Sequence, residues 1–166
     1  MIIMGQKIKA NKSYPFYAAF HDDAYISRHD CCKIVSLREL HESRIYKLNN
    51  PNEKEIVLYR IDGGVIKNND VLKCDYGILT EDNVLFFIEL KGAELDHALD
   101  QIISTIDILL KQKRISVSTL YARIVLSKVK IPNIVETKER KLKQLLHNNY
   151  GGGTYCRKTQ LFDESI

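Results

Sequence analysis

The stretch "LKCDYGILTEDNVLFFIELKG" (residues 72–92) decides how this chain folds, because a short polar break separates two apolar runs in it. The break, "TEDN" (residues 80–83), is typical of a turn between two β-strands. Residues two apart on a strand lie on the same face of a sheet, so Glu89 and Lys91 share a face with Phe87. The hairpin also sets Asp75 close to Glu89. We therefore expect two carboxylates and a lysine together on strands that are otherwise buried.

This charged group predicts a metal site. Two carboxylates within a few ångströms repel each other unless a cation or a proton lies between them. Oxygen ligands favour a hard divalent ion, either Mg²⁺ or Mn²⁺. Lys91 beside them would hold or polarise a water, or balance the charge of a phosphate. The alternative is a structural salt bridge between Lys91 and Asp75 or Glu89, although burying three charges for structure alone costs free energy.

The residues after the hairpin predict two helices alternating with strands. Apolar residues recur at three- and four-residue steps in "AELDHALDQIISTIDILLKQKR" (residues 93–114), which indicates an amphipathic helix. Next, "VSTLYARIVLSKVKI" (residues 117–131) is typical of a strand that ends at Pro132. A second helix, "VETKERKLKQLLHNN" (residues 135–149), precedes a last strand, "TYCRKTQLF" (residues 154–162).

The residues before the hairpin are less regular. Residues 1–30 show no sustained period, so we expect an irregular N-terminal extension with room for a short helix. Residues 35–40 fit a short helix or a strand. Turn residues in "NNPNEK" (residues 49–54) predict a second hairpin, with "RIYKL" and "EIVLYRI" as its arms. The whole order predicts an α/β (α+β) fold, a mixed central β-sheet flanked by helices.

Length and composition favour one domain. A chain of 166 residues with 45% hydrophobic residues fits a single globular domain over residues 1–166. No apolar run reaches the roughly 18 residues that cross a bilayer, and the N-terminus lacks the pattern of a signal peptide. The four cysteines show no CxxC spacing, which is typical of free thiols in a reducing compartment. We therefore expect a cytoplasmic protein without a membrane partner.

Charge is unevenly distributed. The net charge is +4, yet within residues 111–160 Glu136 and Glu139 are the only acids among many lysines and arginines. Such a surface attracts polyanions, although a solvated helix face explains "ETKERKLKQLL" equally well. The C-terminal third is therefore a candidate surface for polyanions.

Asp75 is followed, after thirteen intervening residues, by Glu89-Leu90-Lys91 on a buried strand with an amphipathic helix directly after it. This pattern resembles the PD-(D/E)xK nuclease superfamily, which includes restriction endonucleases, archaeal Holliday-junction resolvases and RecB-type nucleases. The resemblance implies a restriction endonuclease-like core of helix, strands, helix and strand, an order that residues 36–130 follow. It also implies an endonuclease that hydrolyses phosphodiester bonds, in DNA, with Mg²⁺ or Mn²⁺, in defence or repair.

The resemblance assigns roles to residues. Asp75 and Glu89 would hold the metal, with the Leu90 carbonyl as a further ligand, and Lys91 would orient the attacking water and stabilise charge on the phosphate. The nucleic-acid backbone would be held without base reading by Arg123, Lys128, Lys138, Lys141 and Lys143.

The family also uses an acid on its first core helix. Here Glu42 is favoured, with Glu39 close behind and Asp62 as a third candidate, although an exposed, uninvolved glutamate is an equally good interpretation.

RecB-like relatives place a Gln and a Tyr four residues apart on the helix after the lysine. This chain has Gln101 and Thr105 at those positions. We expect Gln101 to face the site and contact a phosphate or a water there, the alternative being an exposed polar residue. The rival function is a non-catalytic nucleic-acid-binding or interaction subunit on the same fold, active only within a larger complex. The small size also leaves a homodimer open, and the sequence does not separate DNA from RNA.

Overall fold

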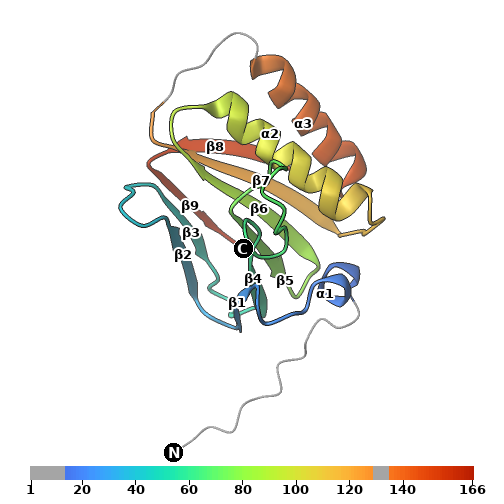
Figure 1. Cartoon of the computed structure of the whole chain (residues 1–166). Helices are drawn as coiled ribbons and strands as arrows, with labels where there is room; N and C mark the ends of the chain where they lie inside the picture. Colours follow the sequence, from blue (N-terminus) through green and yellow to red (C-terminus); the bar gives the residue numbers. More distant parts are fainter. Residues whose placement is uncertain (1–13, 129–134) are drawn as a thin grey trace, which may run out of the picture.

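Three layers make up the part of the chain that this computed structural model describes, residues 14–128 and 135–166 (Figure 1). A six-stranded mixed sheet lies in the middle. Helices cover one of its faces, and a separate three-stranded sheet covers the other. The predicted α/β class with a mixed central sheet is therefore confirmed. The small sheet that replaces helices on the second face was not predicted.

The central sheet has the strand order β1-β4-β5-β6-β7-β8. Its first four strands pair antiparallel, and β6, β7 and β8 pair parallel. Parallel neighbours need a crossover, and α2 provides it between β6 and β7. The strands are β1 (Ile26–Asp30), β4 (Ile56–Arg60), β5 (Tyr76–Thr80), β6 (Val84–Lys91), β7 (Thr119–Leu126) and β8 (Tyr155–Thr159). The expected end of β7 at Pro132 lies outside the described residues.

The hairpin of β5 and β6 forms as predicted. Tyr76 pairs with Ile88 and Gly77 with Phe87, and Asn83 turns the chain with a φ of 59°, a conformation that asparagine tolerates. The two faces of β6 divide as expected. Phe87 packs with the helices, whereas Phe86 and Ile88 pack with the small sheet. The alternation therefore places Glu89 and Lys91 on the helix side.

Both predicted helices are confirmed. Helix α2 (Leu95–Ile106) continues into one π-helical turn, η1 (Asp107–Lys111), and buries its apolar stripe on the sheet. Helix α3 (Val135–Asn149) packs against α2 and β8 and buries Val135, Leu142 and Leu146. No helix within the two described ranges is both long and apolar enough to cross a membrane.

Residues 14–30 are ordered into two elements, although the sequence predicts an irregular extension there. Helix α1 (Pro15–Ala19) buries Phe16 completely, with its ring 5.2 Å from that of Tyr59. Strand β1 then forms the edge of the central sheet. These contacts join residues far apart in the sequence, so no local period reveals them. The remainder of the expected extension, residues 1–13, lies outside the described residues.

The small sheet consists of β2 (Ile34–Arg38), β3 (Ile45–Asn49) and β9 (Leu161–Ser165). The predicted hairpin between residues 44–48 and 55–61 is wrong, because β3 and β4 lie in different sheets. The buried Asn50 explains the crossing. Its side chain donates to the carbonyls of Cys32 (2.9 Å) and Lys54 (2.8 Å), which anchors the chain where it leaves one sheet for the other.

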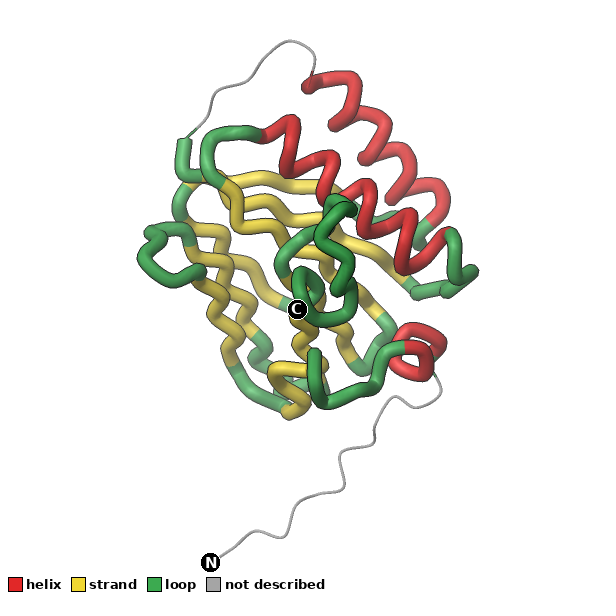
Figure 2. The backbone as a smooth tube through the Cα atoms, viewed as in Figure 1, coloured by secondary structure: helices red, strands yellow, loops and turns green. Residues whose placement is uncertain are grey.

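The last predicted strand is also divided. Gln160 has a φ of 66°, and the chain passes there from β8 in the central sheet to β9 in the small sheet. A long loop, residues 61–75, connects β4 to β5. Figure 2 shows it in green beside α2. This loop carries the backbone that leads into Asp75, so it positions the candidate site.

Candidate active site

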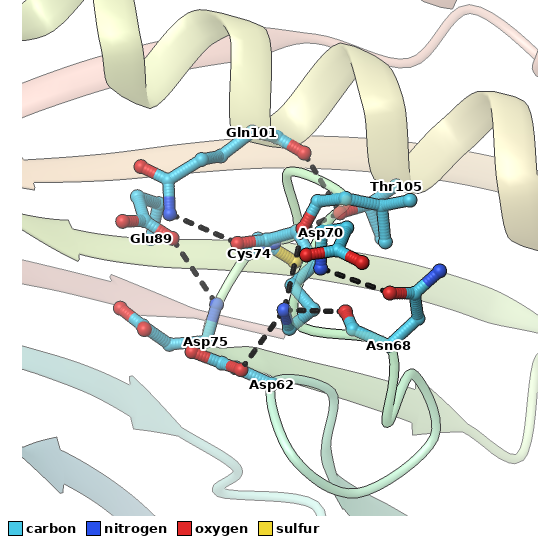
Figure 3. A network of polar contacts seen from close by, with 10 residues as sticks. Asp62, Asn68, Asp70, Cys74, Asp75, Glu89, Gln101 and Thr105 are labelled. Atoms are coloured by element: carbon cyan, nitrogen blue, oxygen red, sulfur yellow. Dashed lines mark hydrogen bonds and ion pairs between the residues drawn. The ribbon is translucent and has the colours of Figure 1, made fainter.

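Asp75 and Glu89 meet at the open end of the β5–β6 hairpin. The N–H of Asp75 donates to Glu89 Oε2 (3.1 Å), and the N–H of Leu90 donates to Asp75 Oδ2 (2.8 Å). Each acid therefore holds the backbone of the other strand, where the regular pairing of the hairpin stops at Tyr76 and Ile88. The two side chains lie side by side in Figure 3. The hairpin spacing predicted this proximity.

Each carboxylate keeps one oxygen without a partner among the described residues, Asp75 Oδ1 and Glu89 Oε1. Glu89 is 1% exposed, and burial, reinforced by the charge of Asp75, raises its pKa well above the usual range. Burial also raises the pKa of Asp75 to about 6, and the charges of Glu39 and Asp62 add to this rise. The site therefore has a shortage of positive charge.

Lys91 ends β6 on the same face as Glu89 and is half-buried. Its charge lowers the pKa of both Asp75 and Glu89, which places the ammonium group near both acids. Among the described residues, however, it forms neither an ion pair nor a hydrogen bond with either acid. The alternative interpretation, a structural salt bridge, is therefore not what the structure shows.

Gln101 and Thr105 hold the backbone that precedes Asp75 (Figure 3). The side-chain amide of Gln101 donates to the Lys73 carbonyl (2.9 Å), and the Thr105 hydroxyl accepts from the N–H of Cys74 (2.8 Å). That hydroxyl also donates to the Gln101 carbonyl (2.7 Å). The two residues are one turn apart on α2, so the helix fixes the Lys73–Cys74 peptide, and through it the position of Asp75.

Gln101 is buried, which excludes the alternative of an exposed polar residue. Its Oε1 has no hydrogen-bond partner, although it is sealed from solvent. A buried acceptor without a donor costs free energy. A cation or an added donor would satisfy it.

The three candidates for a further acid are placed differently. Glu39 and Asp62 line a hollow of about 200 Å³ together with Asp75, Tyr76 and Arg60. Glu39 accepts a hydrogen bond from the Tyr76 hydroxyl (3.0 Å). This contact and burial raise the pKa of Tyr76 to about 12. Glu39 and Asp62 therefore share this hollow with Asp75, and Glu42 is not among the residues that line it.

Glu42, which the sequence favoured, is exposed and pairs with Arg44 at 2.9 Å. The expected first core helix does not form around it, because residues 34–38 are strand β2 and residues 39–44 are a loop. No helix therefore turns the Glu42 side chain toward Asp75.

Arg44 is a residue that the sequence did not reveal. It is 6% exposed, and its Nη1 lies 3.5 Å from the position that a Cβ atom on Gly92 would occupy. Gly92 directly follows Lys91, so the guanidinium lies near the end of β6, on the side of the small sheet. Nothing in the spacing around Arg44 signals this, because the approach depends on how the small sheet packs against the central sheet.

The basic residues expected to bind nucleic acid divide into two groups. Lys138 is paired with Asp96 (2.7 Å) and Asp100 (2.8 Å), and Arg123 is buried and paired with Glu164 (2.8 Å). The exposed ones are Lys128, Lys141 and Lys143. Lys128 follows the end of β7 where Leu126 pairs with Lys91, so it lies at the same edge of the sheet as the candidate site.

The donor set suits a hard divalent cation. It comprises the free oxygens of Asp75 and Glu89 and the unpartnered Oε1 of Gln101, all of them oxygen ligands. Leu90, the third expected ligand, lies between Glu89 and Lys91, with its side chain on the opposite face. In residues 14–128 and 135–166, no three His, Cys, Asp or Glu side chains are grouped as metal ligands. A metal here would thus depend on two carboxylates plus amide or carbonyl oxygens.

Comparison with known proteins adds no relative. No protein-family model matches the chain, and no curated protein or solved structure matches it significantly. The functional argument therefore stands on the geometry of Asp75, Glu89, Lys91 and their neighbours.

Proposed function

We propose that this protein is a nuclease of the PD-(D/E)xK type that hydrolyses phosphodiester bonds in DNA with Mg²⁺ or Mn²⁺. The observation that carries the proposal is the pair of buried carboxylates, Asp75 and Glu89, with Lys91 on the same face of β6 as Glu89. Within the described part of the chain, each acid keeps one oxygen without a partner and Lys91 forms no ion pair. Burying like charges together costs free energy and contributes nothing to packing. Such an arrangement is typical of a functional site that a cation completes.

The surrounding fold supports the same interpretation. The antiparallel strands β5 and β6 carry the charged residues, α2 follows directly, and β7 returns parallel to β6. This is the strand–helix–strand order that the resemblance implies. One element differs, because β2 stands where a first core helix is expected, and the acid from that helix would be replaced by Glu39 or Asp62.

The residues then have distinct tasks. Asp75 and Glu89 would hold the divalent cation, with Leu90 or Gln101 adding an oxygen. When bound, such a cation polarises the phosphoryl group and lowers the pKa of the attacking water. The Lys91 ammonium would orient that water and offset the negative charge that develops on the phosphate. Gln101 and Thr105 keep Asp75 in place through the Lys73–Cys74 peptide.

Cations near the carboxylates would position the substrate. Arg44 lies beside Gly92, and Lys128 lies at the same sheet edge as Lys91. These side chains would contact phosphate groups and supply no sequence reading. The substrate backbone would therefore cross the edge of the sheet where β6 and β7 end.

The test is cleavage of linear, circular, single-stranded and branched DNA, with Mg²⁺ and with a chelator. We expect Mg²⁺-dependent cleavage that is lost in Glu89→Gln, a change that keeps the acceptor for the Asp75 N–H but removes the charge. DNA binding without cleavage by the wild-type protein in Mg²⁺ and Mn²⁺ would instead favour a non-catalytic binding subunit on this fold.

A further inference from the structure

A second pocket lies between the two sheets, away from the carboxylates. Its volume is about 350 Å³, and its lining includes Val84, Phe86, Tyr121, Arg123, Thr154 and Glu164. Val84 and Phe86 stand at the start of β6, whereas Glu89 and Lys91 stand at its end. Phe86 also faces the small sheet, the face opposite to that of Glu89. We call this hollow the inter-sheet pocket.

A buried ion pair forms one side of the inter-sheet pocket. Arg123 Nε donates to Glu164 Oε1 (2.8 Å), and Arg123 Nη1 donates to the Thr154 carbonyl (2.8 Å). Glu164 Oε1 also accepts from the Tyr46 hydroxyl (2.7 Å). These contacts fix both side chains, so the geometry of the pair is set before any ligand arrives.

The same pair keeps two atoms free. Arg123 Nη2 and Glu164 Oε2 have no partner among the described residues. Neither belongs to the buried polar atoms that are sealed from solvent without a partner, so both remain accessible. Because the side chain of Arg123 is only 7% exposed, the inter-sheet pocket gives access to its free N–H. A fixed donor thus stands beside a fixed acceptor.

Aromatic rings form the adjoining wall. The rings of Phe86 and Tyr121 lie 5.0 Å apart, and the Arg123 guanidinium lies 4.8 Å over the Tyr121 ring. Tyr121 is only partly buried, so its ring contributes accessible surface to the pocket. The guanidinium covers part of the Tyr121 ring, so a flat ligand would stack on the part that remains uncovered while its edge faces the donor and the acceptor.

The charges around the inter-sheet pocket cancel. Arg123 is balanced by Glu164, and Lys54 forms an ion pair with Asp82. A pocket that selects phosphate or another anion has an excess of positive charge, which is absent from these lining residues. The ligand that fits is therefore flat, uncharged and able to donate and accept hydrogen bonds along one edge.

We propose that the inter-sheet pocket binds a nucleobase, through stacking on Tyr121 and a paired hydrogen bond to Arg123 and Glu164. Each of the natural bases carries a donor next to an acceptor on one edge, as this pair requires. The base is supplied by a free nucleoside or by an unpaired nucleotide of a strand. This site does not depend on hydrolysis at Asp75 and Glu89.

The test is calorimetric titration of adenosine, guanosine, cytidine and uridine into the full chain without divalent metal. A single-stranded tetranucleotide distinguishes a base within a strand from a free nucleoside, and toluene serves as an apolar ring without a hydrogen-bonding edge. Val84→Phe fills the pocket and leaves Arg123 and Glu164 in place. Ile34→Phe adds the same ring on the exposed face of β2, where Ile34 is 48% exposed, and is the matched control.

We expect at least one nucleoside or the tetranucleotide to bind the wild type and Ile34→Phe equally. Val84→Phe should weaken that binding by at least about tenfold. Line broadening or shifts of the Tyr121 ring resonances on titration would locate the ligand. Absence of binding at millimolar ligand, equal binding by Val84→Phe, or equal affinity for toluene would each overturn the proposal. Because no metal is present, none of these results bears on the nuclease proposal.

Discussion

At the scale of single residues, Asp75 and Glu89 are unusual because each supports the strand of the other while keeping a free oxygen. The backbone contacts stabilise the ionised carboxylates, yet burial dominates and raises the pKa of both. Ionising both carboxylates at once in the metal-free protein therefore brings a repulsion that costs free energy. Removing that repulsion, by a proton, a cation or a substitution, has a measurable effect on stability.

Asp75→Asn should stabilise the metal-free protein at neutral pH. The pKa of Asp75 rises from 3.8 to about 6 on folding, so the folded state binds the proton more tightly than the unfolded state. The stability that this group contributes is complete below the unfolded pKa and is lost as pH rises through the folded pKa. We expect Asp75→Asn to flatten this loss and to raise the free energy of unfolding at pH 7 by about 1–2 kcal/mol.

Urea unfolding at pH 5 and pH 7 in a chelator measures this effect. Adding Mg²⁺ should raise the stability of the wild type at pH 7 more than that of Asp75→Asn, since the cation stabilises the state that it binds. If the wild type and Asp75→Asn lose the same stability between pH 5 and pH 7, the raised pKa of Asp75 does not contribute to the pH dependence of folding.

Lys91→Ala should lower the rate of DNA cleavage by roughly 100-fold or more with little effect on DNA binding, because its charge acts on the transition state. The measurement is single-turnover cleavage in Mg²⁺ beside a binding assay in Ca²⁺. Lys33→Ala, which removes an exposed lysine before β2, is the control and should cut normally. Wild-type rates in Lys91→Ala would remove Lys91 from the mechanism.

At the scale of elements, one helix turn and one hairpin build most of the site. The hairpin β5–β6 and helix α2 were predicted because their signals are local: a turn between apolar runs, and an apolar stripe at helical spacing. Strand pairing between distant segments was not. The sequence predicted a hairpin of β3 and β4. In the structure, the buried hydrogen bonds of Asn50 instead hold the chain where it leaves the small sheet for the central sheet.

The same division holds within the candidate site. Asp75 and Glu89 were placed together correctly because a short hairpin joins them. Arg44 and the contact between Glu39 and Tyr76 were missed, because they arise from packing the small sheet against the central one. Gln101 was expected to face the site. Its hydrogen bond to the Lys73 carbonyl was not predicted, because the loop that carries Lys73 has no regular pattern of apolar residues.

Thr105→Val should weaken Mg²⁺ binding and cleavage by about tenfold, a typical effect of losing a residue that orients a metal ligand. Valine keeps the shape of threonine but cannot accept from the N–H of Cys74, so the peptide that leads into Asp75 loses its anchor. Thr105→Ser keeps the hydroxyl and is the matched control. Calorimetric titration of Mg²⁺ into both variants measures the difference.

A purely structural role of Thr105 predicts a different outcome. Thr105→Val would then lower the midpoint of thermal unfolding and leave the Mg²⁺ affinity of the folded protein unchanged. Recovery of both affinity and cleavage in Thr105→Ser would show that the hydroxyl positions Asp75.

At the scale of the whole molecule, the basic surface is smaller than the sequence suggests. Lys138 is paired with two acids of α2, and Arg123 is paired with Glu164, so neither adds a free charge. Lys128, Lys141 and Lys143 are exposed. The number of lysines and arginines in residues 111–160 therefore overstates the charge that a polyanion would meet.

Lys128→Ala should flatten the dependence of DNA affinity on salt by roughly one unit in the log–log slope, because one released counterion is lost per phosphate contact. Lys138→Ala removes a cation that Asp96 and Asp100 already neutralise, so it is the matched control and should leave the slope unchanged. Binding is measured by fluorescence anisotropy over a series of salt concentrations. A flatter slope in Lys138→Ala alone would move the binding surface to α3.

The small sheet joins segments that lie far apart in the sequence. Its middle strand, β3, pairs with β9, and Ser43 in the loop before β3 donates to Gln160, 117 residues later in the sequence. Contacts of such long sequence separation form late and slow folding. During synthesis, β3 cannot pair with β9 until residues 161–165 have left the ribosome. The loop of residues 39–44, which carries Glu39 toward the hollow beside Asp75, therefore gains its contact with Gln160 only after most of the described residues have been synthesised.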